Sequence, residues 1–165
     1  MDVEQEENDL EQQIRALLMP IMEDSGVEII RIYLGQGGLT QTLRVVIDRR
    51  GGVETGELER ISRALALQLD VEDLFRDEYR LEISSPGLSW PLTTDADFAR
   101  YLDDWICVEL HDGHSIEGRN AGLLGDQLQV QEKNKEIILY PRADIRKVKR
   151  AIDWASVSKR GKQRG

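Results

Sequence analysis

The sequence contains few of the residues on which covalent or metal-based chemistry depends. In 165 residues it has one cysteine, Cys107, and two histidines, His111 and His114. One cysteine cannot form a disulfide within the chain, which is typical of a protein in a reducing compartment. Two histidines with one cysteine nearby fall short of the four ligands of a structural zinc site. We therefore expect no metal site.

Long apolar runs and a secretion signal are also missing. No stretch approaches the roughly 18 consecutive apolar residues that a membrane helix requires. The first residues, MDVEQEENDLEQQ, are acidic, whereas a signal peptide begins with basic residues and continues with an apolar segment. We expect a cytoplasmic protein that makes no membrane contact.

Charge is distributed unevenly along the chain, whose net charge is −9. Residues 1–28 contain nine acids and one arginine, a net charge of −8, whereas residues 142–165 contain nine Lys or Arg and two Asp, a net charge of +7. An acidic body repels phosphates over about 8 Å at physiological salt. A basic protein suits the body and a phosphate-rich surface suits the tail; equally, the charge could serve only solubility, with a disordered end.

The first half predicts the order helix, strand, strand, helix, strand. Apolar residues recur at helical spacing from about residue 9 to 24 and again in GELERISRALALQL, for which Thr55 is the expected N-cap. The second apolar stripe consists of Leu58, Ile61, Leu65 and Leu69. VEIIRIYL, TLRVVIDR and YRLEIS read as strands, and the first two should pair antiparallel. We expect a two-layer α+β domain, residues 1–87, with both helices on one face of the sheet.

Two features of this half resemble nucleotide sites but fit them poorly. The glycines of LGQGG connect two strands, whereas a dinucleotide loop leads from a strand into a helix. Arg49 and Arg50 precede a helix N-terminus whose first turn already carries glutamates, which would repel an incoming anion. We expect no nucleotide or phosphate at either place.

The segment YRLEISSPGLSWPL stops a strand abruptly at Ser-Ser-Pro-Gly. Pro86 fixes φ near −65° and Gly87 can adopt a positive φ, the combination of a type II turn. Leu88 and Leu92 could pack on neighbouring structure while Pro91 stiffens the exit. The segment therefore predicts a rigid hinge that restricts the relative orientation of two domains. The hinge residues are Ser84, Ser85, Pro86, Gly87, Leu88 and Pro91.

The second half predicts a small β domain, residues 88–155, and a basic flexible tail, residues 156–165. A short helical piece, DADFARYL, precedes five expected strands. Five short strands in about 45 residues favour a small closed barrel of the SH3 or Sm kind.

A hairpin is expected at the start of this β domain. Asp112-Gly113 between WICVELH and HSIEGRN fits a two-residue type I′ turn, with His111 and His114 as an ordinary cross-strand pair. The face directed at the core consists of Ile106, Val108 and Leu110.

The segment YRLEISSPGLSWPL resembles the signature of the bacterial ribosome maturation factor RimP family. That signature usually reads Tyr-x-Leu-Glu-Val-Ser-Ser-Pro-Gly-Leu, followed by Asp-Arg-Pro-Leu. The preceding order of elements, with its Gly-Gly-Val, the helix carrying Ile61-Ser62-Arg63, and Leu-Asp-x-Glu-Asp, is also similar, and the resemblance extends to about Trp154. Where the family generally has Asp-Arg, this chain has Ser89 and Trp90.

The resemblance implies a non-enzymatic assembly factor. Such a factor binds the nascent small (30S) ribosomal subunit and contacts a basic small-subunit ribosomal protein near the decoding region and neighbouring 16S rRNA. No nucleophile beside a base, carboxylate pair or phosphate loop argues for an enzyme. We expect a monomer with no catalytic residue, no cofactor and no small-molecule substrate.

The pattern from Val108 to Gly118 also resembles the first Sm motif, although of the base-reading residues of Sm proteins only Arg142 is suggestive here. The cations expected to bind a partner are Arg142, Arg146, Lys147, Lys149, Arg150, Lys159 and Arg160. Strand alternation places Arg146 on the side of Val148, opposite Lys147, so that one surface cannot present every charge.

Two other interpretations stay open. A free-standing Sm-like RNA-binding regulator would act on messenger or small RNA without ribosomes. A catalytic protein using Cys107 would require a reactive thiol of low pKa.

Overall fold

The computed structural model describes residues 3–37 and 40–154. The chain divides into two units, Met1–Pro86 and Gly87–Gly165, and the sequence analysis placed this boundary after Gly87. The expected tail, residues 156–165, lies outside the described residues, as do Lys159 and Arg160.

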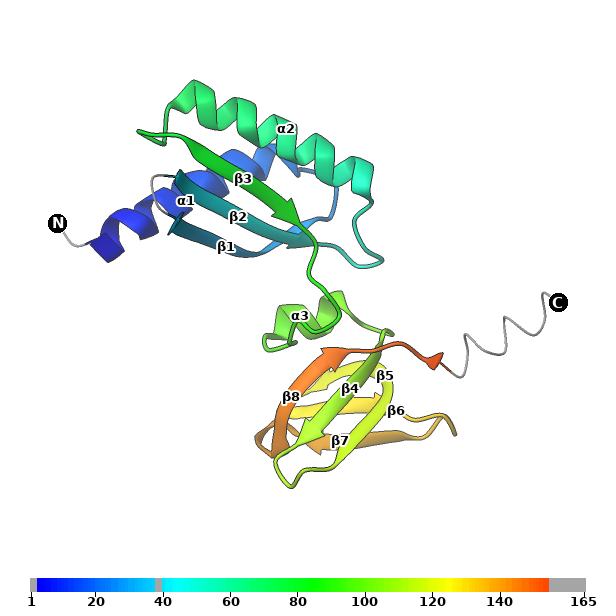
Figure 1. Ribbon diagram of the computed structural model, residues 1–165. Coiled ribbons are helices and arrows are strands. Elements are labelled where there is room, and N and C mark those ends of the chain that lie inside the picture. Colours follow the sequence, from blue (N-terminus) through cyan, green and yellow to red (C-terminus); the bar gives the residue numbers. More distant parts are fainter. Residues whose placement is uncertain (1–2, 38–39, 155–165) are drawn as a thin grey trace. The chain divides into compact units, whose positions relative to one another are not determined.

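The N-terminal unit has the predicted order of elements (Figure 1). They are α1 (Val3–Ile21), β1 (Glu28–Gly37), β2 (Thr40–Asp48), α2 (Thr55–Glu72) and β3 (Tyr79–Ser84). The sheet order is β1-β2-β3; β1 and β2 pair antiparallel, as expected, and β2 and β3 pair parallel. The parallel pair arises because α2 carries the chain back between two strands that run in the same direction.

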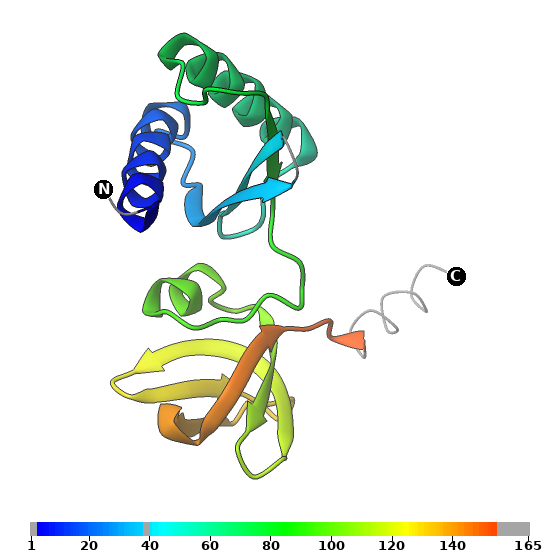
Figure 2. The same ribbon diagram turned by 60° about the vertical axis from the view of Figure 1, so that its left-hand side comes forward.

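Both helices cover one face of this sheet, which confirms the expected two layers (Figure 2). The alternate residues Leu43, Val45 and Ile47 of β2 are fully buried. They share one core with α1 and with the stripe of α2. The helical contributions to this core are Ile14, Leu18, Ile61, Leu65 and Leu69.

The prediction that Thr55 caps α2 is wrong. Thr55 is the first helical residue, and the N-cap is Glu54, whose side chain makes no capping hydrogen bond. The start of α2 is held instead by Arg49, whose guanidinium donates to both Glu57 carboxylate oxygens at 3.0 and 2.8 Å. Arg49 is therefore engaged in an ion pair within the N-terminal unit.

The C-terminal unit consists of a short helix and a five-stranded antiparallel sheet. Its elements are α3 (Asp95–Arg100), β4 (Trp105–Leu110), β5 (Ser115–Leu124), β6 (Gln127–Gln131), β7 (Ile137–Pro141), the 3₁₀ turn η1 (Arg142–Asp144) and β8 (Ile145–Arg150). The sheet order is β7-β6-β5-β4-β8, so the first strand pairs with both the second and the last. Within the described residues, β7 and β8 do not pair with each other, and the expected closed barrel is not found.

The core of this unit lies between the sheet and α3. Ile106 and Val108 are fully buried and Leu110 packs beside them, as the alternation predicts. Phe98 and Tyr101 from the α3 region cover this core. Asn120, fully buried, donates to the carbonyls of both at 2.9 Å and so fastens α3 to β5.

The prediction of a type I′ turn between β4 and β5 is wrong. Of the two central residues only Gly113 has a positive φ, 94°, whereas type I′ requires two. The Leu110 N–H bonds to the His114 carbonyl at 2.8 Å, and the Gly113 N–H to the Leu110 carbonyl at 3.1 Å. The Asp112 carboxylate accepts from the His114 N–H at 2.9 Å, so a longer three-residue loop is stabilised.

The predicted type II turn at Ser-Ser-Pro-Gly is also wrong. Gly87 has no positive φ, and the chain turns later, at Gly87–Trp90, where the Trp90 N–H donates to the Gly87 carbonyl at 3.0 Å. Leu92 is 4% exposed and packs in the core as expected, whereas Leu88 is 45% exposed. The turn at Gly87–Trp90, which we call the corner, leaves Leu88 on its exposed side.

Candidate functional site

We call YRLEISSPGLSWPL, residues 79–92, the signature segment. A groove in the C-terminal unit brings the end of this segment together with some of the cations predicted to bind a partner. Its volume is about 230 Å³. We call it the basic groove; the lining residues that matter below are Pro91, Thr93, Phe98, Arg142, Arg146 and Lys147. It forms because Pro91 bridges to Lys149 and the Leu92 N–H donates to the Val148 carbonyl at 2.8 Å. The segment after the corner thus lies along the free edge of β8.

One arginine of the groove is held against the start of α3. Arg142 donates to Asp95 at 2.7 Å and to the Thr93 carbonyl at 2.9 Å. Its guanidinium carbon also lies 5.6 Å from the centre of the Phe98 ring. The ion pair with Asp95 therefore helps to hold the start of α3 and partly neutralises Arg142, although the Asp95 side chain is largely exposed.

A bulge in β8 changes the expected placement of Arg146. Lys147 pairs with Glu109 and Ile145 with Leu110, so Arg146 has no partner across the strands. Its guanidinium donates to Glu109 at 2.6 Å. The prediction that Arg146 shares the face of Val148 is therefore wrong, because the bulge inserts one residue and breaks the alternation.

The other predicted cations differ in their surroundings. Arg150 lies over the Tyr101 ring, 4.3 Å from its centre, and its Nη2 donates to the Gly87 carbonyl at 3.5 Å. It supports the corner of the signature segment. Lys147 and Lys149 make no ion pair within the described residues. They are the cations of β8 best placed to receive an anion.

Cys107 does not have the features of an activated thiol. Burial raises its pKa, and the carboxylates of Glu117 and Glu109 raise it further against the opposing effect of Lys149. A raised pKa lowers the thiolate fraction at neutral pH. His114, in the loop between β4 and β5, pairs with Asp112 at 3.0 Å, and the described residues contain no group of three metal-ligating side chains.

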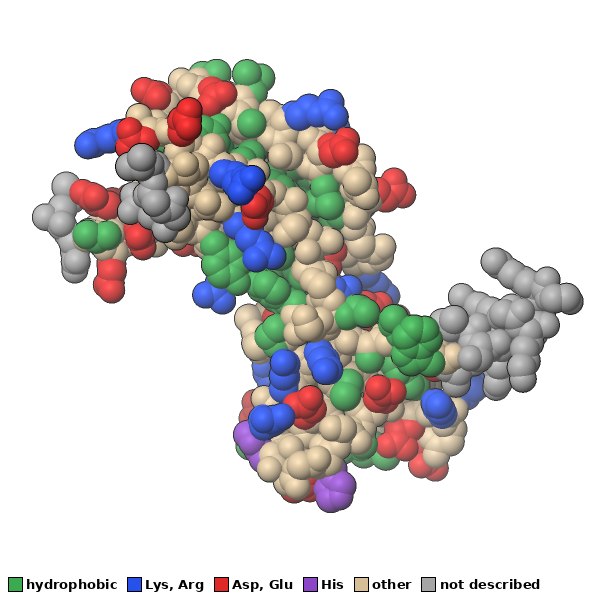
Figure 3. Space-filling view, in the orientation of Figure 1, with side chains coloured by type: hydrophobic (Ala, Val, Ile, Leu, Met, Phe, Trp, Pro, Cys, Tyr) green, Lys and Arg blue, Asp and Glu red, His purple; other side chains and the backbone are tan. Residues whose placement is uncertain are grey.

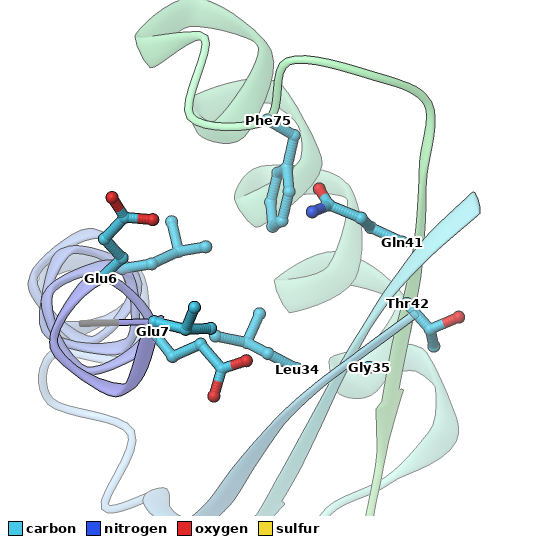
Figure 4. A pocket seen from close by; sticks show the side chains of 9 residues that line it. Glu6, Glu7, Leu34, Gly35, Gln41, Thr42 and Phe75 are labelled. Atoms are coloured by element: carbon cyan, nitrogen blue, oxygen red, sulfur yellow. The ribbon is translucent and has the colours of Figure 1, made fainter. Parts of the chain in front are cut away.

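A second recess lies in the N-terminal unit, at one end of the sheet. This acidic pocket has a volume of about 340 Å³ and is bordered by α1, the ends of β1 and β2, and Phe75. Figure 4 shows Phe75 pointing into it from the segment after α2, with Glu6 and Glu7 on α1 across from Gln41. Leu34 adds apolar surface. The pocket thus combines an apolar wall with an exposed acidic rim.

The sequence analysis missed this pocket. The segment DVEDLFRDE at the end of α2 and after it is mostly charged, but Phe75 within it is only 6% exposed and stacks on Tyr79 with ring centres 4.7 Å apart. A single phenylalanine among charged residues was the available signal. No alternation or helical period marked it, because the residue lies between elements.

The two units thus carry two chemically different surfaces, a groove of basic residues and a pocket with an acidic rim. Residues 17–89 match the family model described as the RimP N-terminal domain. The match runs from α1 to the signature segment. By this match the N-terminal unit is similar to the N-terminal domain of the RimP family of ribosome maturation factors. No helix in the part of the chain that the structure describes is long and apolar enough to span a bilayer.

Proposed function

We propose that this protein assists assembly of the small (30S) ribosomal subunit by binding its nascent form. The observation that carries this proposal is the match of residues 17–89 to the RimP N-terminal domain. In the proposed complex the protein contacts a basic small-subunit ribosomal protein and nearby 16S rRNA. It acts in the cytoplasm as a monomer and without catalysis.

The acidic pocket is the proposed contact for the basic ribosomal protein. Glu6 and Glu7 lie at its rim on α1, whose first turn is also acidic. A lysine or arginine of the partner could pair with these carboxylates while its apolar stem or neighbour packs on Leu34 and Phe75. Such a contact uses both the charge and the shape of the recess.

The basic groove is the proposed contact for rRNA. Lys147 and Lys149 on β8 are available to phosphates, and Arg146 on β8 and Arg142 in η1 add to the positive charge. Guanidinium and ammonium groups supply most of the affinity for a phosphate backbone. Lys159 and Arg160 of the predicted tail would add to this contact.

The segment from Ser84 to Pro91 is the proposed hinge. Its second half is fastened to the C-terminal unit through Pro91 and Leu92, so any relative motion of the units is confined to few residues. Exposed Leu88 could contact the partner directly. The C-terminal unit is proposed to be of the SH3 or Sm type, because pairing of its first strand with its last begins to close the sheet.

Co-sedimentation with purified immature and mature small subunits tests the function. We expect the protein to travel with immature particles, and the charge reversal Arg146→Glu/Lys147→Glu to weaken this at least tenfold. Lys133→Glu/Lys135→Glu is the matched control, since both lysines are exposed and lie outside the groove. The acidic pocket is tested by the same co-sedimentation: Glu6→Lys/Glu7→Lys is the test variant, and Glu23→Lys/Glu72→Lys is its control.

The same gradient distinguishes the alternative. A free-standing Sm-like regulator would stay with small RNAs at the top of the gradient, and particles would be free of it. That result would overturn the proposed function.

A further inference from the structure

The face of the N-terminal sheet opposite the helices carries three arginines around one aromatic ring. Since Leu43, Val45 and Ile47 face the helices, the alternation directs Arg44 of β2 to the other side. The register places Tyr33 opposite Arg44, and Arg80 opposite Thr42. Figure 3 shows Lys or Arg side chains gathered where this face is turned to the viewer. We call Arg31, Tyr33, Arg44 and Arg80 the arginine face.

The ring and two of the guanidiniums are in contact. The guanidinium carbon of Arg31 lies 4.8 Å from the centre of the Tyr33 ring, and that of Arg44 lies 5.8 Å from it. Cation–π attraction holds both groups beside the ring without consuming their hydrogen-bond donors. The donors remain directed to solvent, since all three arginines are exposed.

The arginine face differs in its pairing from most arginines of this chain. None of its three guanidiniums makes an ion pair or a hydrogen bond with a described residue. Elsewhere arginines have carboxylate partners; examples are Arg15, Arg49, Arg63, Arg100, Arg142 and Arg146. Two acids follow the same alternation: Glu82, which lies opposite Arg44 in the register of β2 and β3, and Asp48 at the end of β2, which is only 2% exposed. The three exposed, unpaired arginines outnumber the exposed acid Glu82 and give this face a positive charge on a unit that is acidic elsewhere.

We propose that the arginine face binds single-stranded RNA. Phosphates would be held by Arg31, Arg44 and Arg80, since a guanidinium fork matches phosphate oxygens in a bidentate manner. A base or ribose would pack on Tyr33 and its flanking guanidiniums, because aromatic residues on a sheet face stack exposed bases. Strands about 4.8 Å apart spread the cations over roughly 10 Å, enough to reach two neighbouring phosphates.

An acidic protein is the less suitable occupant. Its carboxylates could pair with the arginines but would leave the ring unused. RNA uses both the charge and the ring. The inference rests on the proposed function for the source of the RNA, and it adds an RNA contact on the N-terminal unit to the one proposed in the basic groove.

The test is fluorescence anisotropy of the full chain with a fluorescein-labelled single-stranded RNA of 12 nucleotides. For Arg44→Gln/Arg80→Gln we expect at least tenfold weaker binding, with a log–log salt slope shallower by about 0.7 for each phosphate that is no longer neutralised. Tyr33→Ala should bind about tenfold more weakly because the base has no ring to stack on, and Tyr33→Phe should retain most of the affinity. Glu82→Gln should bind more tightly than the parent chain.

The matched control is Arg60→Gln/Arg63→Gln, which removes two exposed charges from α2. Circular dichroism establishes that each variant is folded. Equally weakened binding in the control and in Arg44→Gln/Arg80→Gln, or unchanged binding in the latter, would overturn the proposal. Competition by polyglutamate as effective as that by unlabelled RNA would also overturn it, in favour of an acidic protein.

Failure of this inference is distinguishable from failure of the proposed function. If arginine-face variants bind the RNA normally while the parent chain still travels with immature subunits, the arginine face is not an RNA site and the assembly role stands. If RNA binding depends on the arginine face but no subunit is bound, the RNA site stands and the assembly role falls.

Discussion

Arg100 donates a 2.8 Å hydrogen bond to the Asp97 carboxylate, and both side chains are almost completely buried. The second carboxylate oxygen accepts from the backbone N–H groups of Thr93 and Thr94 at 2.9 and 3.0 Å. Burial by itself would raise the pKa of Asp97, but these N–H donors and Arg100 together hold it below its ordinary value. One carboxylate thus joins the end of the signature segment to α3.

This arrangement predicts a pH-dependent contribution to stability. Because the folded-state pKa of Asp97 is lowered, its contribution is fully present above the unfolded value of about 4 and is lost as the pH falls below it. For Asp97→Asn at pH 7 we expect a free energy of unfolding, measured in urea, that is about 3 kcal/mol lower than that of the parent chain. The difference should shrink at pH 3.

Tryptophan fluorescence measures this, since Trp90, Trp105 and Trp154 all lie in the C-terminal unit. An exposed carboxylate, as in Asp77→Asn, is the control and should leave the midpoint nearly unchanged. If Asp97→Asn lowers the free energy of unfolding equally at pH 7 and pH 3, the ionised carboxylate of Asp97 does not stabilise the fold as argued.

Gly118 predicts a steric limit in β5. A Cβ added there would lie 2.6 Å from the Gln131 carbonyl oxygen and 2.6 Å from a methyl of Val130. We expect Gly118→Ala to lower stability by about 2 kcal/mol, because β5 and β6 must move apart. Gly56→Ala is the matched control: it meets no atom within 4 Å and lies in a helix, where Ala is preferred by up to about 1 kcal/mol. Thermal unfolding of both variants should shift in opposite directions.

The two leucines of the signature segment predict separable effects. Leu92 is buried in the C-terminal core, so Leu92→Ala should destabilise the unit by about 2 to 4 kcal/mol. Leu88 is 45% exposed, and Leu88→Ala should leave the unfolding midpoint within about 0.5 kcal/mol of the parent. If Leu88 contacts the subunit, its variant should instead sediment less with immature particles. A stable Leu92→Ala would show that the corner is not anchored through this side chain.

Cys107 predicts a slow reaction with alkylating reagents. Its raised pKa leaves less thiolate than a free cysteine has at pH 7.5, so iodoacetamide should modify it more slowly than N-acetylcysteine. Glu117→Gln should accelerate the reaction, because one source of the raised pKa is removed. Mass spectrometry follows the modification. A rate above that of N-acetylcysteine would support the catalytic-thiol interpretation.

The periodic parts of the fold could be predicted from the sequence. The stripe from Leu58 to Leu69 and the alternation from Leu43 to Ile47 each expose one apolar face, and both faces are buried where expected. Turn geometry could not be predicted as reliably as the helices and strands. Asp112 and Gly87 were assigned to turn types by residue preference alone, whereas side-chain hydrogen bonds and the attachment of Leu92 to β8 decide the actual turns.

The candidate site could be predicted only in part. The signature segment and the cations of β8 were both identified, but no local pattern shows that Pro91 lies beside Lys149. The bulge at Arg146 was equally hidden, since it depends on the register with Glu109. Arg31, Arg44 and Arg80 lie on three strands, and only the pairing of these strands brings them to one face.

The pairing of β4 with β8 has a consequence for synthesis of the chain. The ribosome makes β4 first among the five strands of the C-terminal unit and β8 last, yet the two are neighbours. Val108 therefore stays without its partner Val148 until the final strand has left the exit tunnel. The N-terminal unit is complete once Ser84 has emerged, so it can fold while the C-terminal unit is still being made, whereas the C-terminal unit must wait for β8.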